Sequence, residues 1–185
     1  IRAKGTMVGN ICNASPSCDS GPIVLATDAR ILYHGLEGDR ELNAGEFFKG
    51  VKKTALEPGD IVTGIIFPPL KKNQKAVYIK HSVRKAMDLA IVGVAVVITV
   101  ENKICTDARI AVGAVAATPI RAPKAEEFLV GKELTDEVIE EAAQITMDSC
   151  SPISDIRASK EYRSAMVKVF TKRAIKKALE DMQEV

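Results

Sequence analysis

The chain has 185 residues, 46% hydrophobic and 27% charged, a mixture that can fold around a core without disulfides or metals. The formal net charge is +2 and both signs are interspersed, so neither nucleic acid nor an anionic membrane is expected as a partner. The four cysteines form no Cys-x-x-Cys pair and predict no metal site, whereas free cysteines favour a cytoplasmic location. No apolar run is long enough to predict a membrane span.

The first part of the chain is predicted to be a loop followed by short helices and strands. Residues 1–21 are rich in Gly, Ser, Asn and Pro, which predicts a structured loop. The chain opens on Ile1 rather than Met, and a further segment is therefore expected upstream. The pattern then predicts a helix over 22–29, strands over 30–33 and 40–42, a helical turn over 44–50, and a strand over 60–67 that ends at two prolines.

The second part is predicted to be a sheet followed by helices. The polar stretch 70–75 follows the two prolines and marks the boundary between the parts. Strands are expected over 76–81, 91–101 and 106–115, the last two joined as a hairpin at Asn102. Helices are expected over 122–129, 135–147 and 159–182. Strands followed by helices predict an α+β fold, with the three helices packed on one face of an antiparallel sheet.

The segment Thr6–Gly21 concentrates small hydroxyl and amide side chains around glycine. Gly9 permits close approach of the backbone or a positive φ, and backbone N–H groups in such a turn can bind an anion. Thr6, Asn10 and Asn13 can supply neutral hydrogen bonds, and Asp19 can accept them from hydroxyl groups. A surface turn held by Asx and Ser/Thr motifs is the alternative that composition alone leaves open. The spacing is neither a Walker A motif nor a dinucleotide fingerprint.

Six segments, in order along the chain, resemble the FAD-binding medium subunits of the molybdenum hydroxylase family. That family includes the medium subunit of carbon monoxide dehydrogenase and the flavin domain of xanthine dehydrogenase. The first segment has the pattern Thr-x-x-Gly-Asn-x-x-x-Ala-Ser-Pro-x-x-Asp. The six are Thr6–Asp19, Phe47–Ile61, Lys80, Arg84–Ala90, Ala117–Ala122 and Ser154–Arg163.

The resemblance implies a division of the chain and a set of cofactor-binding residues. Residues 1–70 would be the C-terminal subdomain of a vanillyl-alcohol-oxidase-like FAD-binding domain, and residues 71–185 a carbon monoxide dehydrogenase flavoprotein-like C-terminal domain. Asp19 would bind the hydroxyl-bearing portion of FAD, Val62 would pack near the flavin ring, and Lys80 would lie near the isoalloxazine edge. The phosphate and adjacent groups would contact Thr6, Gly9, Asn10 and Asn13. No residue is assigned as catalytic or as a metal ligand.

The resemblance also implies partners. The family's first FAD subdomain, with its own phosphate motif, has no counterpart in this sequence, so the chain alone is expected to bind FAD poorly. A molybdopterin subunit and an iron–sulfur subunit carrying two [2Fe–2S] clusters would complete a hetero-oligomer, generally a dimer of heterotrimers. Electrons would pass through FAD to an external acceptor. A non-catalytic scaffold or docking module, and an FAD oxidase without a molybdenum partner, are the alternatives.

Two further expectations concern individual residues. Val8 stands where the family has the first of two adjacent glycines, so either the position needs no positive φ or the turn is remodelled. Charged side chains near the second sheet are expected to hold loops and helix ends rather than to act in catalysis. They are Arg84 with Asp88, and Asp155 with Arg157 and Arg163.

Overall fold

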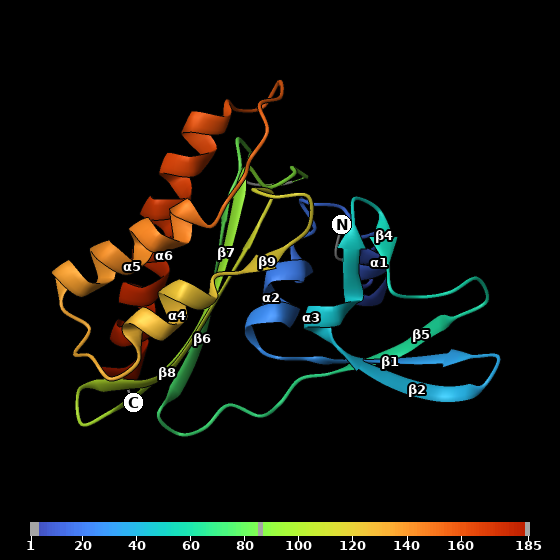
Figure 1. Ribbon diagram of the computed structural model, residues 1–185, viewed down its shortest axis with the longest axis horizontal. Coiled ribbons are helices and arrows are strands. Elements are labelled where there is room, and N and C mark those ends of the chain that lie inside the picture. Colours follow the sequence, from blue (N-terminus) through green and yellow to red (C-terminus); the bar gives the residue numbers. More distant parts are fainter. Residues whose placement is uncertain (1–3, 85–86, 184–185) are drawn as a thin grey trace.

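The computed structural model describes residues 4–84 and 87–183, and it divides into two packed parts (Figure 1). The first part contains three short helices, a three-stranded antiparallel sheet of order β2-β1-β5 and a small β3-β4 pair. Its elements are α1 (Met7–Cys12), α2 (Ser20–Ala26), β1 (Arg30–Gly35), β2 (Gly38–Asn43), α3 (Ala44–Phe47), β3 (Phe48–Gly50), β4 (Lys53–Thr54) and β5 (Ile61–Ile66).

Helix α1 corrects the prediction of a loop over residues 1–21, of which 1–3 lie outside the described residues. The Thr6 side chain accepts a hydrogen bond from the Gly9 N–H at 2.9 Å and so caps the helix. Ile11 is fully buried and anchors it, and Ala14, with φ of 43°, ends it in the left-handed region. Glycine and asparagine have low helix propensity, so the composition of this segment did not predict a helix. The Thr6 cap and the burial of Ile11 stabilise it.

The predicted strands of the first part are confirmed, each within a few residues. Ile31 of β1 lies opposite Leu42 of β2 and Ile65 of β5, which places an apolar row on one face of the sheet. That face packs into a core with Ile11 and Phe47. The β3-β4 pair was not predicted, because it is only a few residues long and its connection uses Lys52 at φ of 54°, a residue with no turn preference.

The second part confirms the predicted antiparallel sheet with three helices on one face. Its strands have the order β6-β7-β8-β9, and β7 and β8 form the predicted hairpin. Figure 1 shows the helices on one side of this sheet and α2 on the other. Strand β9 was not predicted, because two residues give no periodic pattern. The elements are β6 (Gln74–His81), β7 (Val92–Glu101), β8 (Ile104–Gly113), β9 (Ile120–Arg121), α4 (Pro123–Leu129), α5 (Asp136–Asp148) and α6 (Lys160–Gln183).

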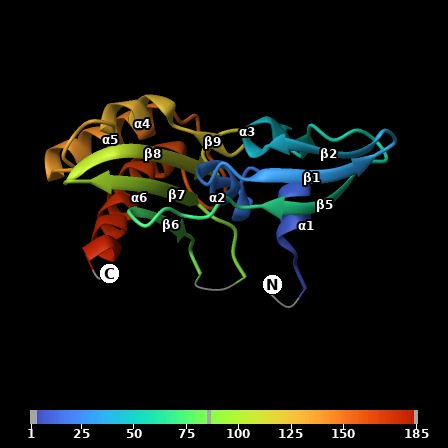
Figure 2. The same ribbon diagram turned by 90° about the horizontal axis from the view of Figure 1, so that it is seen from below.

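Strand β7 is apolar on both faces because each face belongs to a different core. Val94, Val96 and Ile98 pack with the three helices of the second part. Ala95 and Val97 point to the opposite face and pack with residues of the first part, including Val24 and Leu25 of α2. The continuous apolar sequence of the strand follows from this two-sided burial. Helix α2 therefore fixes the first part against the sheet, while the three-stranded sheet extends away from it (Figure 2).

Ion pairs also join the two parts. Asp28, which follows α2, accepts a hydrogen bond from Arg109 of β8 at 2.8 Å and one from Arg121 of β9 at 2.7 Å. Arg121 in turn donates to both oxygens of Glu126 on α4. Because the guanidinium groups of Arg109 and Arg121 are mostly buried, these contacts fix the end of α2 on the sheet.

Candidate functional site

A recess of about 670 Å³ opens between the start of α1 and the start of α2. Four of the seven residues predicted to bind FAD line it: Thr6, Gly9, Asn10 and Asp19. Its other lining residues are Lys4, Gly5, Met7, Ser20 and Ile23. A recess of this size, lined by hydroxyl, amide, carboxylate and backbone groups, suits the polar part of a cofactor.

Gly9 keeps the floor of the recess open. A Cβ atom at this position would lie 3.0 Å from the Thr6 hydroxyl oxygen, which is tighter than an ordinary contact. Gly9 lies inside α1 and has no positive φ. The glycine is therefore needed for close approach to the backbone and the Thr6 hydroxyl, not for an unusual backbone angle.

Asn10 connects the two helices that border the recess. Its Oδ1 accepts hydrogen bonds from the backbone N–H of Ser20, at 3.1 Å, and from the Ser20 hydroxyl. This oxygen satisfies the N–H of the first residue of α2, and the N-cap residue Asp19 makes no side-chain capping bond to the helix. The Asn10 NH₂ group remains as the donor that a ligand can reach, and the Asp19 carboxylate is left for other partners.

Asp19 receives hydrogen bonds from two side chains of β6. Lys80 Nζ lies 2.7 Å from Asp19 Oδ2, and the Tyr78 hydroxyl lies 3.3 Å from Oδ1. Lys80 also donates to the Asp88 carbonyl at 2.7 Å. The structure thus brings Lys80, the fifth predicted residue, to the recess through Asp19. Tyr78 was not predicted, although its position two residues before Lys80 places both side chains on one face of a strand.

The other two predicted residues lie elsewhere. Asn13 is exposed at the C-terminal end of α1, where its backbone N–H donates to the Gly9 carbonyl at 3.1 Å. Val62 lies on β5, half-buried against the core of the first part. Neither belongs to the lining of the recess.

Val8 lies within α1, and its backbone is right-handed and helical. Of the two possibilities raised by its departure from the family pattern, the structure has the first: the position needs no positive φ. A β-branched residue is tolerated there at a small cost in helix propensity.

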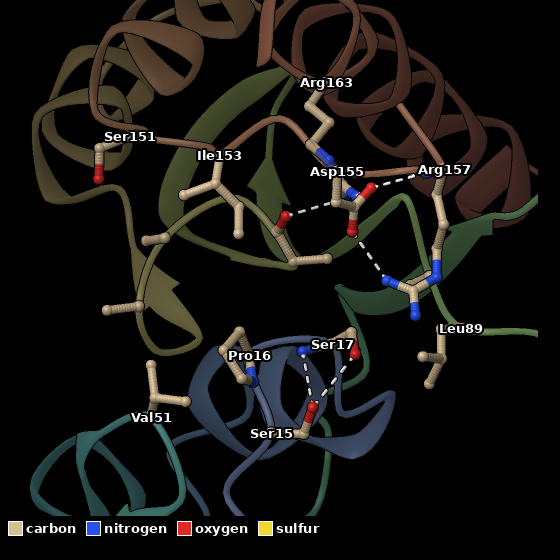
Figure 3. A pocket seen from close by; sticks show the side chains of 14 residues that line it. Ser15, Pro16, Ser17, Val51, Leu89, Ser151, Ile153, Asp155, Arg157 and Arg163 are labelled. Carbon is tan, nitrogen blue, oxygen red and sulfur yellow. Dashed lines mark hydrogen bonds and ion pairs between the residues drawn. The ribbon is translucent and has the colours of Figure 1, made fainter. Parts of the chain in front are cut away.

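The predicted structural role of the Asp155 cluster is confirmed, and the cluster borders a second cavity of about 460 Å³ (Figure 3). Arg163, whose side chain is only 4% exposed, donates to the Ile91 carbonyl at 2.7 Å and to Asp155 at 2.8 Å. Burial opposes ionisation of Asp155, but the backbone N–H of Arg157 and the Arg163 guanidinium outweigh it and lower its pKa to about 2. These bonds fix the loop before α6 to the start of β7.

Arg84 and Asp88 close the loop after β6, as predicted. The backbone N–H of Arg84 donates to the Asp88 carboxylate at 2.8 Å, and the Arg84 guanidinium donates to the Met87 carbonyl at 3.3 Å. Lys85 and Ala86, in the same predicted segment, lie outside the described residues. The closed loop presents the Asp88 carbonyl to Lys80, and so connects this segment to the recess.

The part of the chain that the structure describes has no cluster of three or more His, Cys, Asp or Glu side chains arranged to hold a metal ion. Burial raises the pKa of Cys18, beside the recess, to about 11, so its thiol stays protonated at neutral pH. Within residues 4–84 and 87–183, no helix is long and apolar enough to cross a membrane.

The architecture is that of a flavoprotein component of the molybdopterin dehydrogenases. Residues 1–70 match the FAD binding domain in molybdopterin dehydrogenase. Residues 77–178 match the CO dehydrogenase flavoprotein C-terminal domain. The chain belongs to this CO dehydrogenase flavoprotein family, and FAD is its cofactor.

Relatives of known name agree with this membership. The chain is 36% identical over 176 residues to the glyceraldehyde dehydrogenase medium chain of Sulfolobus acidocaldarius, covering 95% of this chain and 62% of the relative. It is 33% identical over 180 residues to a putative xanthine dehydrogenase FAD-binding subunit of Escherichia coli, covering 97% and 62%. A carbon monoxide dehydrogenase structure from Hydrogenophaga pseudoflava superimposes with a TM-score of 0.94 at 32% identity, covering 97% and 62%. The chain thus spans about 62% of the length of these relatives.

The residues of the recess fit the polar part of FAD. The missing Cβ of Gly9 leaves room beside the Thr6 hydroxyl, and Asn10 offers an amide donor. The Asp19 carboxylate suits hydroxyl or ring N–H donors rather than phosphate, because like charges repel. Lys4 supplies positive charge in the lining of the recess, and the charge of Lys80 is paired with Asp19.

Proposed function

We propose that this chain is the FAD-binding electron-transfer component of a molybdenum-dependent dehydrogenase, receiving electrons from iron–sulfur clusters of a partner and passing them to an external acceptor. The observation that carries the proposal is the recess, where Thr6, Gly9, Asn10 and Asp19 meet between two helix starts. The membership of the chain in a family of FAD-binding domains supports it. FAD supplies the two-electron and one-electron chemistry when it is bound.

Each predicted residue has a role in this proposal. Thr6, Gly9 and Asn10 bind the phosphate and neighbouring groups of FAD in the recess, Asn13 contacts these groups from outside it, and Asp19 binds the hydroxyl-bearing portion. Val62 packs near the ring system. Lys80 places a positive charge near the isoalloxazine edge, where it favours negative charge on the reduced cofactor. None of them transfers a proton or forms a covalent bond.

The proposed partners complete the cofactor site and the electron path. An N-terminal FAD subdomain supplies the other side of the FAD cleft, and this chain contributes residues 1–70 as the second subdomain and 71–185 as the C-terminal domain. A molybdopterin subunit and an iron–sulfur subunit join it in a cytoplasmic hetero-oligomer. The names of the relatives, which include medium chains and FAD-binding subunits, support this arrangement, and the four free cysteines support the cytoplasm.

The chain by itself is expected to bind FAD weakly and to be inactive. The recess is open to solvent on one side, and an open half-site leaves much of a ligand hydrated. A scaffold that holds partner subunits without binding FAD is the rival function, and the experiment below separates the two.

The test is an FAD titration, followed by flavin absorbance, of the chain alone and mixed with the N-terminal FAD subdomain of the Hydrogenophaga pseudoflava medium chain. Flavin binding in the mixture only is the expected result. Asn10→Ala should weaken that binding, whereas the control Asn73→Ala, far along the chain in the connection to β6, should not. If the mixture does not bind FAD although circular dichroism shows that both pieces are folded, the proposal is overturned in favour of the scaffold.

A further inference from the structure

The Tyr78 hydroxyl reaches across β7 to the site residue Asp19. Tyr78 and Lys80 both lie on β6. The Tyr78 hydroxyl donates to Asp19 Oδ1, and Lys80 Nζ donates to Asp19 Oδ2. The Asp19 side chain is 45% exposed and makes no capping bond to its own helix. The orientation of this carboxylate therefore depends on β6.

Gly93 makes the reach of Tyr78 possible. It lies opposite Lys80 in the β6-β7 register, and a Cβ atom there would lie 2.9 Å from the Tyr78 hydroxyl and 3.4 Å from its ring. Any side chain at this position would displace the tyrosine ring. This contact is the physical reason for a glycine near the start of a long, otherwise well-packed strand.

Tyr78 is fixed as a hydrogen-bond donor. Burial is the largest cause that raises its pKa, and the negative charge and hydrogen bond of Asp19 raise it further. The phenol thus stays protonated throughout the physiological range, and its O–H can only serve Asp19 as a donor.

We infer that Tyr78 is a positioning residue of the FAD site, which acts with Lys80 to hold both carboxylate oxygens of Asp19 and so sets how Asp19 faces the recess. The inference rests on the proposed function, since it assigns Asp19 to the cofactor. The Lys80 ammonium holds one oxygen of Asp19 and the Tyr78 hydroxyl holds the other, so the orientation of the carboxylate is fixed. The lone pairs that remain for a ligand then point in fixed directions. An acceptor fixed before the ligand arrives loses less conformational entropy on binding.

The contact itself can be tested without FAD. The chain has three tyrosines, so the double variant Tyr33→Phe/Tyr162→Phe leaves Tyr78 as the only one. Its Raman Fermi doublet should show a phenol that donates a hydrogen bond, and Asp19→Asn should shift the doublet toward a weaker donor. Asp39→Asn, on the exposed β1-β2 hairpin, is the control. A doublet that Asp19→Asn leaves unchanged would overturn the inference.

The effect on the cofactor is measured in the FAD titration of the mixture with the N-terminal subdomain. Tyr78→Phe should weaken FAD binding by about three- to tenfold, because an Asp19 side chain that is no longer fixed loses its rotamer freedom when FAD binds. Gly93→Ala should do the same because it displaces the hydroxyl, and the double variant should lose little more than either single one. Tyr162→Phe, whose hydroxyl contacts His81 instead, is the control.

The outcomes separate the two proposals. If the unmodified mixture does not bind FAD, the proposed function fails and the role of Tyr78 toward FAD fails with it. If the mixture binds FAD and Tyr78→Phe binds it as tightly, only the inference is overturned. Should Tyr78→Phe destabilise the fold, the Raman measurement, in which Tyr78 is left in place, still tests the contact with Asp19.

Discussion

At the scale of single residues, the polar side chains at the recess form hydrogen bonds that connect α1 to α2 and α2 to β6. Asn10 accepts from the backbone N–H of Ser20 at the start of α2, and Asp19 makes no capping bond but accepts from Lys80 and Tyr78. The sequence and the family resemblance predicted Thr6, Gly9, Asn10, Asn13 and Asp19 as one group close along the chain, and the recess contains all of them except Asn13. The sequence could not identify Tyr78, whose contact depends on how β6 lies against the start of α2.

Val8 provides the first prediction at this scale. Since Val8 lies in a right-handed helix, Val8→Gly should add no useful backbone freedom and should lower the free energy of unfolding by about 0.5 to 1 kcal/mol. FAD binding in the mixture should not improve. Chemical denaturation measures the first effect and the FAD titration the second, with Val8→Ala to separate the loss of the side chain from the gain in flexibility. Tighter FAD binding by Val8→Gly alone would contradict this account.

At the scale of elements, helices and strands with strong apolar patterns were predictable and the weakly patterned ones were not. Strand β7 and helices α5 and α6 were predicted within a few residues, because their sequences have clear periodicity or capping signals. Helix α1 was missed, because its stability comes from the Thr6 cap and the burial of Ile11 rather than from propensity. Strand β9 exists only because its neighbour β8 pairs with it.

The start of α6 gives a pH-dependent prediction. The pKa of Asp155 falls from its ordinary value of 3.8 to about 2 in the folded chain. A carboxyl with a depressed pKa contributes stability that is present above the ordinary value and is lost as the pH falls through about 2. Asp155→Asn should lower the free energy of unfolding by about 2 kcal/mol at neutral pH, because the buried Arg163 loses its anionic partner.

The measurement is urea denaturation between neutral pH and the acid range. Asp155→Asn should flatten the decline in stability between the two pKa values, whereas the exposed control Asp148→Asn should keep the decline of the unmodified chain. Equal acid sensitivity of Asp155→Asn and the unmodified chain would show that other groups cause the decline.

At the scale of the whole molecule, Asp28 is the residue whose loss should weaken the contact between the two parts. Asp28→Ala removes the acceptor of both Arg109 and Arg121 and places alanine at a φ of 49°. The expected loss is about 2 kcal/mol in the free energy of unfolding. Asp28→Asn tolerates the same backbone angle and keeps hydrogen-bonding oxygen, so it should lose less. Thermal unfolding by calorimetry measures the stability of both variants. If Asp28→Ala is as stable as the unmodified chain, the ion pairs of Asp28 do not stabilise the contact between the two parts.

The two-sided burial of β7 limits how chimeras of this family can be built. A hybrid that joins residues 1–70 of one relative to residues 71–185 of another brings a foreign α2 against Ala95, Val97 and Ala111. These small side chains accept only a helix of matching shape, and one extra methyl group in such a contact costs about 1 to 3 kcal/mol. Grafts that exchange α2 together with the facing residues of β7 and β8 should therefore fold more often than grafts that change the chain at the linker alone.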